Sequence, residues 1–181
     1  MELICEAPAK INLSLVIKGK RADGFHDLET RMVKVTLADR LHLEKRNSGI
    51  TVLCPESDLP TDEGNLVHRA AKSFLTTLGT GGVHIVLEKK VPIAAGLGGG
   101  SSDAAAVLRG LNALYDSPYS LAQLVDFARP LGADVPFFVD DCAAAWATGI
   151  GDEIHAEDIR FSGWIVLVNP GFPVSTKWVY E

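Results

Sequence analysis

The stretch that decides the fold is Pro92-Ile93-Ala94-Ala95-Gly96-Leu97-Gly98-Gly99-Gly100-Ser101-Ser102-Asp103-Ala104. An alternating apolar pattern over 83–88 predicts a strand before it, and a helical pattern follows over 102–115. Four of the five positions from 96 to 100 are glycine, so the backbone is free to adopt left-handed conformations and to approach a ligand closely. Two serines stand where the helix N-cap is expected. Backbone N–H groups and the positive end of a helix dipole would face one spot, which predicts a phosphate-binding loop.

Simpler interpretations of this loop fit the residues less well. An ordinary capped turn needs about one or two glycines. A Walker loop would place a lysine at the helix start, and no lysine lies between Val91 and Arg109. A dinucleotide fingerprint would need glycine or alanine where Ser101 stands, and an acidic residue ending a second strand, whereas Asp116 follows the predicted helix. We therefore expect a phosphate cradle of a third kind.

The composition limits the class of protein. With 181 residues, 47% of them apolar, the chain is long enough for one domain with a sizeable core, or for one domain and part of another. The net charge of −6 argues against a nucleic-acid or anionic membrane surface, so we expect no nucleic acid and no membrane as partners. Cys5, Cys54 and Cys142 lie outside any CxxC pair, which indicates reduced thiols. No secretion leader or membrane-spanning run is recognised, and the expected compartment is the cytoplasm.

The residues before the loop predict a series of strands. Residues 2–17 are expected to form two short strands, and the alternation from Ile11 to Ile17 predicts that the second is half-buried. Lys10 lies at the mouth of that strand, where a lone lysine is ordinarily a solvated charge. Further strands are expected at 31–37, 41–45 and 50–54.

A polar loop over 19–27 separates these strands. It contains an Asp-Gly pair, which is typical of a turn. Phe25 and His26 are unusual in such a loop. The two rings either enter the core or present a flat surface and a hydrogen-bonding group to a base.

Capping residues mark two further helices. Asn65 is expected to cap a helix that ends at Gly79, with apolar residues at four-residue steps between them. Ser120-Leu121-Ala122-Gln123 is a capping box, and it opens a helix that Pro130 and Gly132 would stop. The residues of this helix expected to face inward are Leu121, Leu124, Val125 and Ala128.

The last third of the chain holds one isolated carboxylate, Asp134, in the apolar run from Leu131 to Val139. A buried charge must be paired, hydrogen-bonded or functional, and a helix cap or an ion pair explains Asp134 as well as a function does. Beyond it we expect a strand at 143–147, a tight turn at 149–151 and an all-apolar strand at 164–168. We assign residues 1–155 to one domain and 156–181 to the start of a second domain that is mostly absent.

Taken together, these segments resemble the GHMP kinase superfamily. The matching stretches follow the family's order from residue 8 to about 151: Pro8-Ala9-Lys10-Ile11-Asn12-Leu13, Arg21-Ala22-Asp23-Gly24-Phe25-His26, Gly64-Asn65-Leu66-Val67-x-Arg69-Ala70-Ala71, Pro92 to Asp103, and Gly132-Ala133-Asp134-Val135-Pro136-Phe137. The resemblance implies an α+β fold, the GHMP kinase N-terminal domain of the ribosomal-protein-like domain 2 type, with a mixed or antiparallel sheet and helices on one side. It also implies that the C-terminal domain is largely absent.

The segments around Lys10 and His26 are specific to one branch of the family. That branch phosphorylates the 2-hydroxyl of 4-diphosphocytidyl-2-C-methyl-D-erythritol with ATP and Mg²⁺, in non-mevalonate isoprenoid precursor biosynthesis. By position, Asp134 resembles the general base for that hydroxyl. Lys10 resembles the residue that positions the base and the hydroxyl and offsets charge on the transferring phosphoryl group.

The resemblance also implies which residues hold the two substrates. Residues Pro92 to Ser102 correspond to the ATP phosphate site, with Ser101 or Ser102 as the candidate magnesium ligand. Asn65 and Lys89 fall where the family contacts adenine. The cytidine substrate is expected to meet His26 as the cytosine-reading residue, Phe25 and Tyr180 as rings on the two faces of the base, and Asn12.

Other function classes stay open at this point. Another GHMP small-molecule kinase, for homoserine or mevalonate, would share the glycine loop but lack the His26 segment. The acidic balance disfavours a non-catalytic RNA- or translation-associated module of related fold, and Ser101 disfavours a nucleotide-binding oxidoreductase. An N-terminal domain alone would expose an apolar face, so a homodimer is a further expectation.

Overall fold

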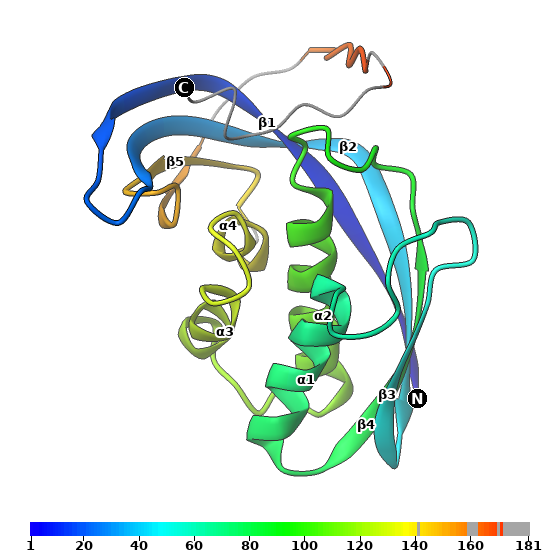
Figure 1. Ribbon diagram of the computed structural model, residues 1–181. Helices are drawn as coiled ribbons and strands as arrows, with labels where there is room; N and C mark the ends of the chain where they lie inside the picture. Colours follow the sequence, from blue (N-terminus) through cyan, green and yellow to red (C-terminus); the bar gives the residue numbers. More distant parts are fainter. Residues whose placement is uncertain (141, 159–162, 170, 172–181) are drawn as a thin grey trace.

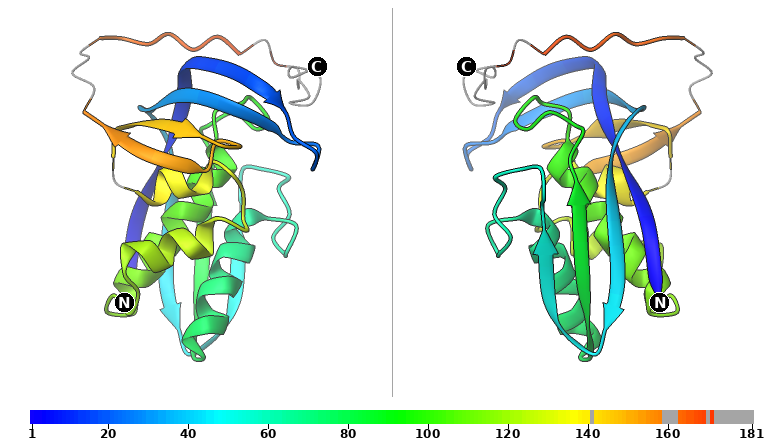
Figure 2. Two further views of the ribbon diagram at one scale, coloured as in Figure 1. Left: turned by 90° about the vertical axis from the view of Figure 1, so that its left-hand side faces the viewer. Right: turned by 90° about the vertical axis from the view of Figure 1, so that its right-hand side faces the viewer.

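In the computed structural model, which describes residues 1–140, 142–158, 163–169 and 171, a mixed sheet carries all the helices on one face (Figures 1 and 2). The strand order is β3-β4-β2-β5-β6, with β1 paired to β2 outside this path. The strands are β1 (Glu2–Lys20), β2 (His26–Arg46), β3 (Ser48–Leu53), β4 (Gly81–Glu88), β5 (Ala144–Thr148) and β6 (Glu153–Glu157). Among the strands of the described residues, only β3 and β4 pair in parallel. The predicted α+β fold with helices on one side is confirmed.

The first two strands are much longer than the sequence predicted. Instead of two short strands over 2–17, β1 runs without a break for 19 residues, and the strands expected at 31–37 and 41–45 are one strand of 21 residues. The register of the β1–β2 pair shifts at three places, between Pro8 and Lys10, between Asn12 and Ser14, and between Ile17 and Gly19. Such bulges absorb residues that interrupt the alternation, so the strand bends instead of ending.

The prediction of a half-buried strand from Ile11 to Ile17 is wrong. Leu13, Leu15 and Ile17 are between 38% and 49% exposed, and Val16 is 50% exposed. This half of the β1–β2 pair extends past the helices, so none of the described helices covers it (Figures 1 and 2). Alternation alone indicates a strand, but burial requires something to pack against.

The helices are α1 (Leu66–Leu78), α2 (Gly99–Leu114), α3 (Leu121–Ala128) and α4 (Val135–Val139). Asn65 caps α1 through a bond from the Val67 N–H, and Gly79 ends it in a left-handed conformation, both as predicted. The capping box at Ser120 is also formed. One inward assignment in α3 is wrong, because Leu121, in its first turn, is 51% exposed.

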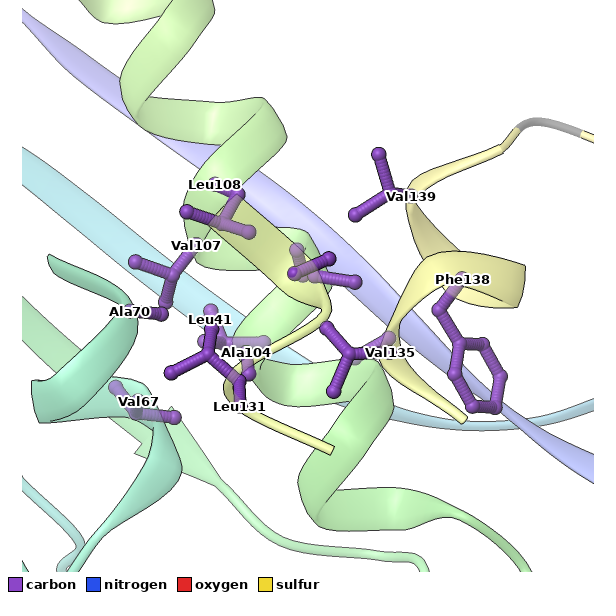
Figure 3. Close-up of a cluster of buried hydrophobic side chains, with 14 of the residues drawn as sticks. Leu41, Val67, Ala70, Ala104, Val107, Leu108, Leu131, Val135, Phe138 and Val139 are labelled. Carbon is purple, nitrogen blue, oxygen red and sulfur yellow. The ribbon is translucent and has the colours of Figure 1, made fainter. Parts of the chain in front are cut away.

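Helix α2 lies at the centre of the core and contacts β1, β2 and the other three helices. Figure 3 shows Ala104, Val107 and Leu108 of this helix between Val67 and Ala70 of α1 and Val135 and Val139 of α4. All three α2 side chains are fully buried. Gly110 faces the sheet, where a Cβ atom would come within 2.2 Å of Leu43 Cδ1. Small residues therefore let this helix lie close against the strands, which fixes its N-terminal end over the sheet.

The segment after α4 agrees with the sequence only in part. The strand at 143–147 and the turn at 149–151 are confirmed by β5 and by the bond from Gly151 N–H to the Thr148 carbonyl. The strand expected at 164–168 is wrong, because these residues form no ladder in the described chain and Trp164 is 99% exposed. Tyr180 lies outside the described residues. No helix in the described part of the chain is both long and apolar enough to cross a membrane.

Candidate active site

Two adjoining pockets meet at the glycine loop. One, here called the loop pocket, has a volume of about 370 Å³ and lies between the loop and the Pro60–Asn65 region. The other, here called the arm pocket, has a volume of about 600 Å³ and lies between the loop and the β1–β2 pair. The part of this pair that extends past the helices is here called the arm. Both are lined by Pro92, Ala94, Ala95, Gly96, Leu97 and Gly98. Groups bound in the two pockets would therefore be neighbours across the loop.

The backbone of the loop has the conformation that its glycines predict. Gly96 and Gly98 have φ values of +73° and +69°, and Ala94 takes a φ of 56°, which is unusual for a residue with a Cβ atom. Gly98 is also tightly enclosed, because a Cβ atom there would lie 3.0 Å from both Lys10 Cγ and the Phe138 ring. The Lys10 N–H donates to the Leu97 carbonyl at 2.9 Å and thereby fastens the loop to β1.

The start of α2 differs from the prediction and favours anion binding more directly. The N-cap is Gly98, not a serine, and the helix begins at Gly99 instead of residue 102. The first N–H with a helical partner is that of Ser102, which donates to the Gly98 carbonyl at 2.9 Å. In a helix this leaves the preceding N–H groups, those of Gly99, Gly100 and Ser101, without intrahelical acceptors. With no side chain at the cap, these donors and the helix dipole are available to a ligand phosphate.

Lys10 and Asp134 face each other in the wall of the arm pocket. The Lys10 Nζ lies 3.4 Å from Asp134 Oδ2, and it also donates to Asn12 Oδ1 at 3.3 Å. The Lys10 side chain is only 7% exposed, so the ordinary interpretation of a solvated surface lysine is wrong. Ala9 and Lys10 are both buried at the register shift between Pro8 and Lys10, whereas a regular strand would place these neighbours on opposite faces of the sheet.

Asp134 is held by a different element. It occupies the N-cap position of the short helix α4, yet its side chain makes no capping hydrogen bond. Its carboxylate is 33% exposed and lines the arm pocket beside Lys10. Of the interpretations that the sequence left open, the helix cap is wrong and the ion pair is present, with the carboxylate still accessible to a ligand.

A second charged cluster lies beneath the loop, and the sequence interpretation missed it. Lys89 Nζ binds the carboxylate of Asp39 and donates to Asp103 Oδ2 at 2.8 Å. The exposed fractions of the three side chains are 0% for Asp39, 8% for Lys89 and 2% for Asp103. The sequence shows only an aspartate, Asp39, in the gap between the strands expected at 31–37 and 41–45, which does not by itself predict this cluster.

The charges in this cluster shift one another's pKa. Burial raises the pKa of the Asp103 carboxyl to about 7; the ammonium of Lys89 opposes this rise and the carboxylate of Asp39 adds to it. Burial lowers the pKa of Lys89, but Asp103 and Asp39 more than offset that effect, so the net shift is upward. The lysine is therefore held as a cation between the two acids.

The structure brings together some of the other predicted site residues. Asn65 lines the loop pocket and donates to the Pro60 carbonyl at 2.8 Å while it caps α1. Lys89 also borders this pocket, although its ammonium binds the two aspartates. Asn12 lines the arm pocket.

Phe25 and His26 are not brought to Lys10 and Asp134. They lie at the turn that joins β1 and β2, where Phe25 is 58% exposed, and they are not among the described residues that line either pocket. The arm pocket is instead bordered along the arm by residues that the sequence interpretation missed: Leu15, Leu28, Thr30, Met32 and Leu37.

The serines differ in their fit to a magnesium ion. Mg²⁺ in nucleotide sites is usually bound by one or two protein oxygens and by substrate phosphates, so it needs no cluster of acids. The described residues contain no group of three or more His, Cys, Asp or Glu suited to a metal. Ser101 lines the loop pocket, whereas the Ser102 hydroxyl is buried without a hydrogen-bond partner. The Ser101 hydroxyl therefore fits such an ion better than that of Ser102.

Comparison with known proteins connects this arrangement with one group of enzymes. Residues 65–145 match the family model described as the GHMP kinases N-terminal domain. Over 97% of its length the chain is 51% identical to 4-diphosphocytidyl-2-C-methyl-D-erythritol kinase of Desulfotalea psychrophila and 49% identical to that of Syntrophus aciditrophicus. A crystal structure of 4-(cytidine 5'-diphospho)-2C-methyl-D-erythritol kinase superimposes over 99% of the chain with a TM-score of 0.80 and 41% identity.

These relatives are longer than the present chain. The chain spans 60% and 63% of the two relatives' lengths, and 63% of the crystallised protein. All three alignments include the glycine loop, Lys10 and Asp134, because each covers nearly the whole of the present sequence.

Proposed function

We propose that this chain is part of a GHMP kinase, and that the protein transfers the γ-phosphoryl group of ATP to the 2-hydroxyl of 4-diphosphocytidyl-2-C-methyl-D-erythritol. The observation that carries this proposal is the Lys10–Asp134 pair, held 3.4 Å apart against the loop whose free N–H groups suit phosphates. Phosphoryl transfer needs alignment, charge neutralisation and one proton acceptor, and this site offers all three.

Each of the two pockets has its own part in the reaction. The N–H groups at the start of α2 and the glycine loop bind the phosphates of ATP from the loop pocket. The acceptor alcohol enters the arm pocket, where Asp134 takes the proton from the attacking hydroxyl. Lys10 orients that carboxylate and lies near the phosphoryl oxygens, where its charge stabilises the transition state.

Magnesium belongs to the same proposal. The Ser101 hydroxyl, together with ATP phosphate oxygens, would hold the ion beside the start of α2. When bound, Mg²⁺ neutralises phosphate charge.

The cytidine moiety lies farther along the arm. Asn12 and the apolar residues that border the arm pocket lead from Lys10 toward the β1–β2 turn, which carries Phe25 and His26. We assign cytosine recognition to His26 and base stacking to Phe25 and Tyr180. Adenine recognition is assigned to Asn65, which borders the loop pocket. Lys89, the other residue expected to contact adenine, also borders this pocket, but its ammonium is bound by Asp39 and Asp103.

The remaining assignments concern the whole protein. Its reaction lies in non-mevalonate isoprenoid precursor biosynthesis, its compartment is the cytoplasm, and its assembly is a homodimer. The proposed catalytic N-terminal domain extends from residue 1 to the end of β6 at Glu157, just past the boundary expected at 155, because Ala156 and Glu157 pair with β5. The rest of the segment to 181 is assigned to the start of the next domain.

The decisive experiment is an assay of the 181-residue chain with ATP, Mg²⁺ and 4-diphosphocytidyl-2-C-methyl-D-erythritol, followed by ³¹P NMR. A phosphomonoester signal that grows with time is the expected result. Homoserine and mevalonate serve as alternative acceptors, and their preferential phosphorylation would contradict the substrate assignment.

If the chain shows no turnover, calorimetry measures whether it still binds the cytidine substrate. Saturable binding without turnover would support the proposed substrate and would indicate that catalysis needs residues outside this chain. The absence of both turnover and binding would contradict the proposed substrate.

A further inference from the structure

The glycine loop leaves the sheet at a point where the strand ladder stops. The last pair between β4 and β2 joins Glu88 to Arg40, and the chain then diverges from the sheet. Asp39 is the next residue on β2, and its Oδ1 accepts hydrogen bonds from the N–H groups of Lys90 and Val91, the latter at 2.8 Å. A buried carboxylate thus replaces the missing strand partner of the two residues that open the loop.

The far end of the loop is fastened to the same cluster. Lys89 reaches from the end of β4 to Asp103, which lies in the second turn of α2, and the Nζ–Oδ2 distance is 2.8 Å. The same ammonium binds the other carboxylate oxygen of Asp39. Both ends of the loop, residues 90–91 and residue 103, therefore meet at one charged group.

The burial of this cluster is costly and calls for an explanation. Asp39, Lys89 and Asp103 are almost wholly removed from water, and Asp103 Oδ1 has no hydrogen-bond partner in the described structure. Such a cluster contributes little stability compared with apolar side chains, but it imposes directional contacts that an apolar core does not. Here the directional contacts act on the backbone of the loop.

We propose that Asp39, Lys89 and Asp103 form a clamp, a set of positioning residues that holds the phosphate-binding loop in its ligand-ready conformation. The inference rests on the proposed function for the identity of the ligand, ATP, but the order of the loop can be measured without it. Asp39 and Asp103 act through the loop and touch no reacting atom. Lys89 acts in the same way, since its ammonium is occupied by the two aspartates.

The test compares Asp39→Ala and Asp103→Asn with the wild-type 181-residue chain. Hydrogen exchange of the 93–101 amides is measured without nucleotide, and ATP affinity is measured by calorimetry. We expect faster exchange of the loop amides in both variants and, for Asp39→Ala, ATP affinity lower by about 10- to 100-fold, because positioning errors of about 1 Å have effects of this size.

Tyr115→Phe is the matched control. The Tyr115 hydroxyl, at the opposite end of α2, accepts a hydrogen bond from the Gly82 N–H and donates one to the Gly82 carbonyl, both at 2.9 Å, so its loss removes two partly buried hydrogen bonds. We expect this variant to lose stability while loop exchange and ATP affinity stay unchanged. If the clamp variants behave like this control, the clamp proposal is overturned and the proposed function stands.

A double variant separates positioning from stability. Lys89→Met alone leaves the acidic groups of Asp39 and Asp103 buried together without a cation, and adding Asp103→Asn removes one of the two acids. Lys89→Met/Asp103→Asn should therefore recover stability relative to Lys89→Met while its loop amides still exchange rapidly. Recovery of loop protection would overturn the clamp. This double variant also provides a second test if Asp39→Ala does not fold.

The clamp can also be tested if the wild-type chain does not bind ATP. If the wild-type chain fails to bind ATP, the proposed function fails for this chain, and the exchange data still decide the clamp. Loss of loop protection in Asp39→Ala or Asp103→Asn then supports it, and unchanged protection overturns it.

Discussion

At the scale of single residues, the chemistry depends on the surroundings of two sets of charged side chains. Lys10 and Asp134 share a pocket wall, and the carboxylate remains partly exposed to a ligand. The Asp39–Lys89–Asp103 cluster is closed to solvent instead. The first arrangement suits a group that must exchange a proton with a substrate, whereas the second suits a fixed support.

The first prediction concerns Asp134→Asn. The amide cannot accept the substrate proton, so we expect turnover to fall by about 10²- to 10⁴-fold, the usual contribution of a general base. ATP affinity should stay nearly unchanged because the loop pocket is intact. Asp140→Asn is the control, since Asp140 lies at the other end of α4 and accepts a bond from the Cys142 N–H. Wild-type turnover in Asp134→Asn would end the general-base assignment.

The second prediction concerns the pH dependence of stability. Burial raises the pKa of Asp103 from its ordinary 3.8 to about 7, so between these values the folded chain holds a proton that the unfolded chain has released. The free energy of unfolding should therefore fall as pH rises through this window, by at most about 1.4 kcal/mol per pH unit. Urea unfolding between pH 4.5 and 8 measures the slope.

Asp103→Asn isolates this effect from the other groups around the cluster. Lys89 and Cys54 also face Asp103, but their pKa values are raised from 10.5 and 9.0, so they titrate at higher pH. Asp39 faces Asp103 from β2 and is present in both proteins. The pH dependence should flatten in the variant, and an identical slope in the two proteins would refute the role of Asp103.

At the scale of elements, the site is a junction between a strand, a loop and a helix. Strand β4 ends at Glu88, the loop turns through left-handed residues, and α2 begins at Gly99 without a capping side chain. This leaves the first turn of α2 open to an anion. Helix α2 is fixed in turn by close packing against the sheet at Gly110. The position of these N–H groups thus follows from the packing of the whole helix.

The third prediction compares Gly98→Ala with Gly96→Ala. Both residues have positive φ values, so each substitution should cost about 1–2 kcal/mol of backbone strain. A Cβ atom at Gly98 would also meet Lys10 and Phe138 at 3.0 Å, whereas one at Gly96 would have no atom within 4 Å. We expect Gly98→Ala to be less stable than Gly96→Ala by about 1–3 kcal/mol, the usual cost of overpacking. Denaturant unfolding checks this, and equal losses would contradict the close contact.

At the scale of the whole molecule, one sheet serves two purposes. Where helices cover it, the sheet is the wall of the core (Figure 2). Where β1 and β2 extend past the helices, they form an arm that borders the larger pocket and carries exposed apolar side chains. An exposed apolar surface of this kind favours association with another surface.

The fourth prediction is that the 181-residue chain self-associates through the arm. Sedimentation velocity over a range of concentrations should show a dimer, in keeping with the proposed homodimer. Leu13→Lys/Ile17→Lys should weaken it, since both residues lie on the arm and are more than 40% exposed. Ile4→Lys, at the other end of β1 and 56% exposed, is the control and should leave it unchanged. A monomer at every concentration would contradict the prediction.

The sequence by itself determined the features that depend on neighbouring residues. The glycine loop with its left-handed residues, the caps at Asn65, Gly79 and Ser120, and the strand before the loop were all predicted, because each is encoded by hydrogen bonds and steric limits within a few residues. Lys10 and Asp134 were also named, but their pairing came from a family resemblance and not from the local pattern.

Only the tertiary structure decided which residues are buried and which distant charges meet. The continuous β1 and β2, the exposed Leu13 and the unpaired 164–168 segment depend on what packs against each strand, which alternation does not specify. The Asp39–Lys89–Asp103 cluster joins a strand, a strand end and a helix from separate parts of the chain. Such contacts form only when the sheet and α2 pack together, so no local signal could have predicted them.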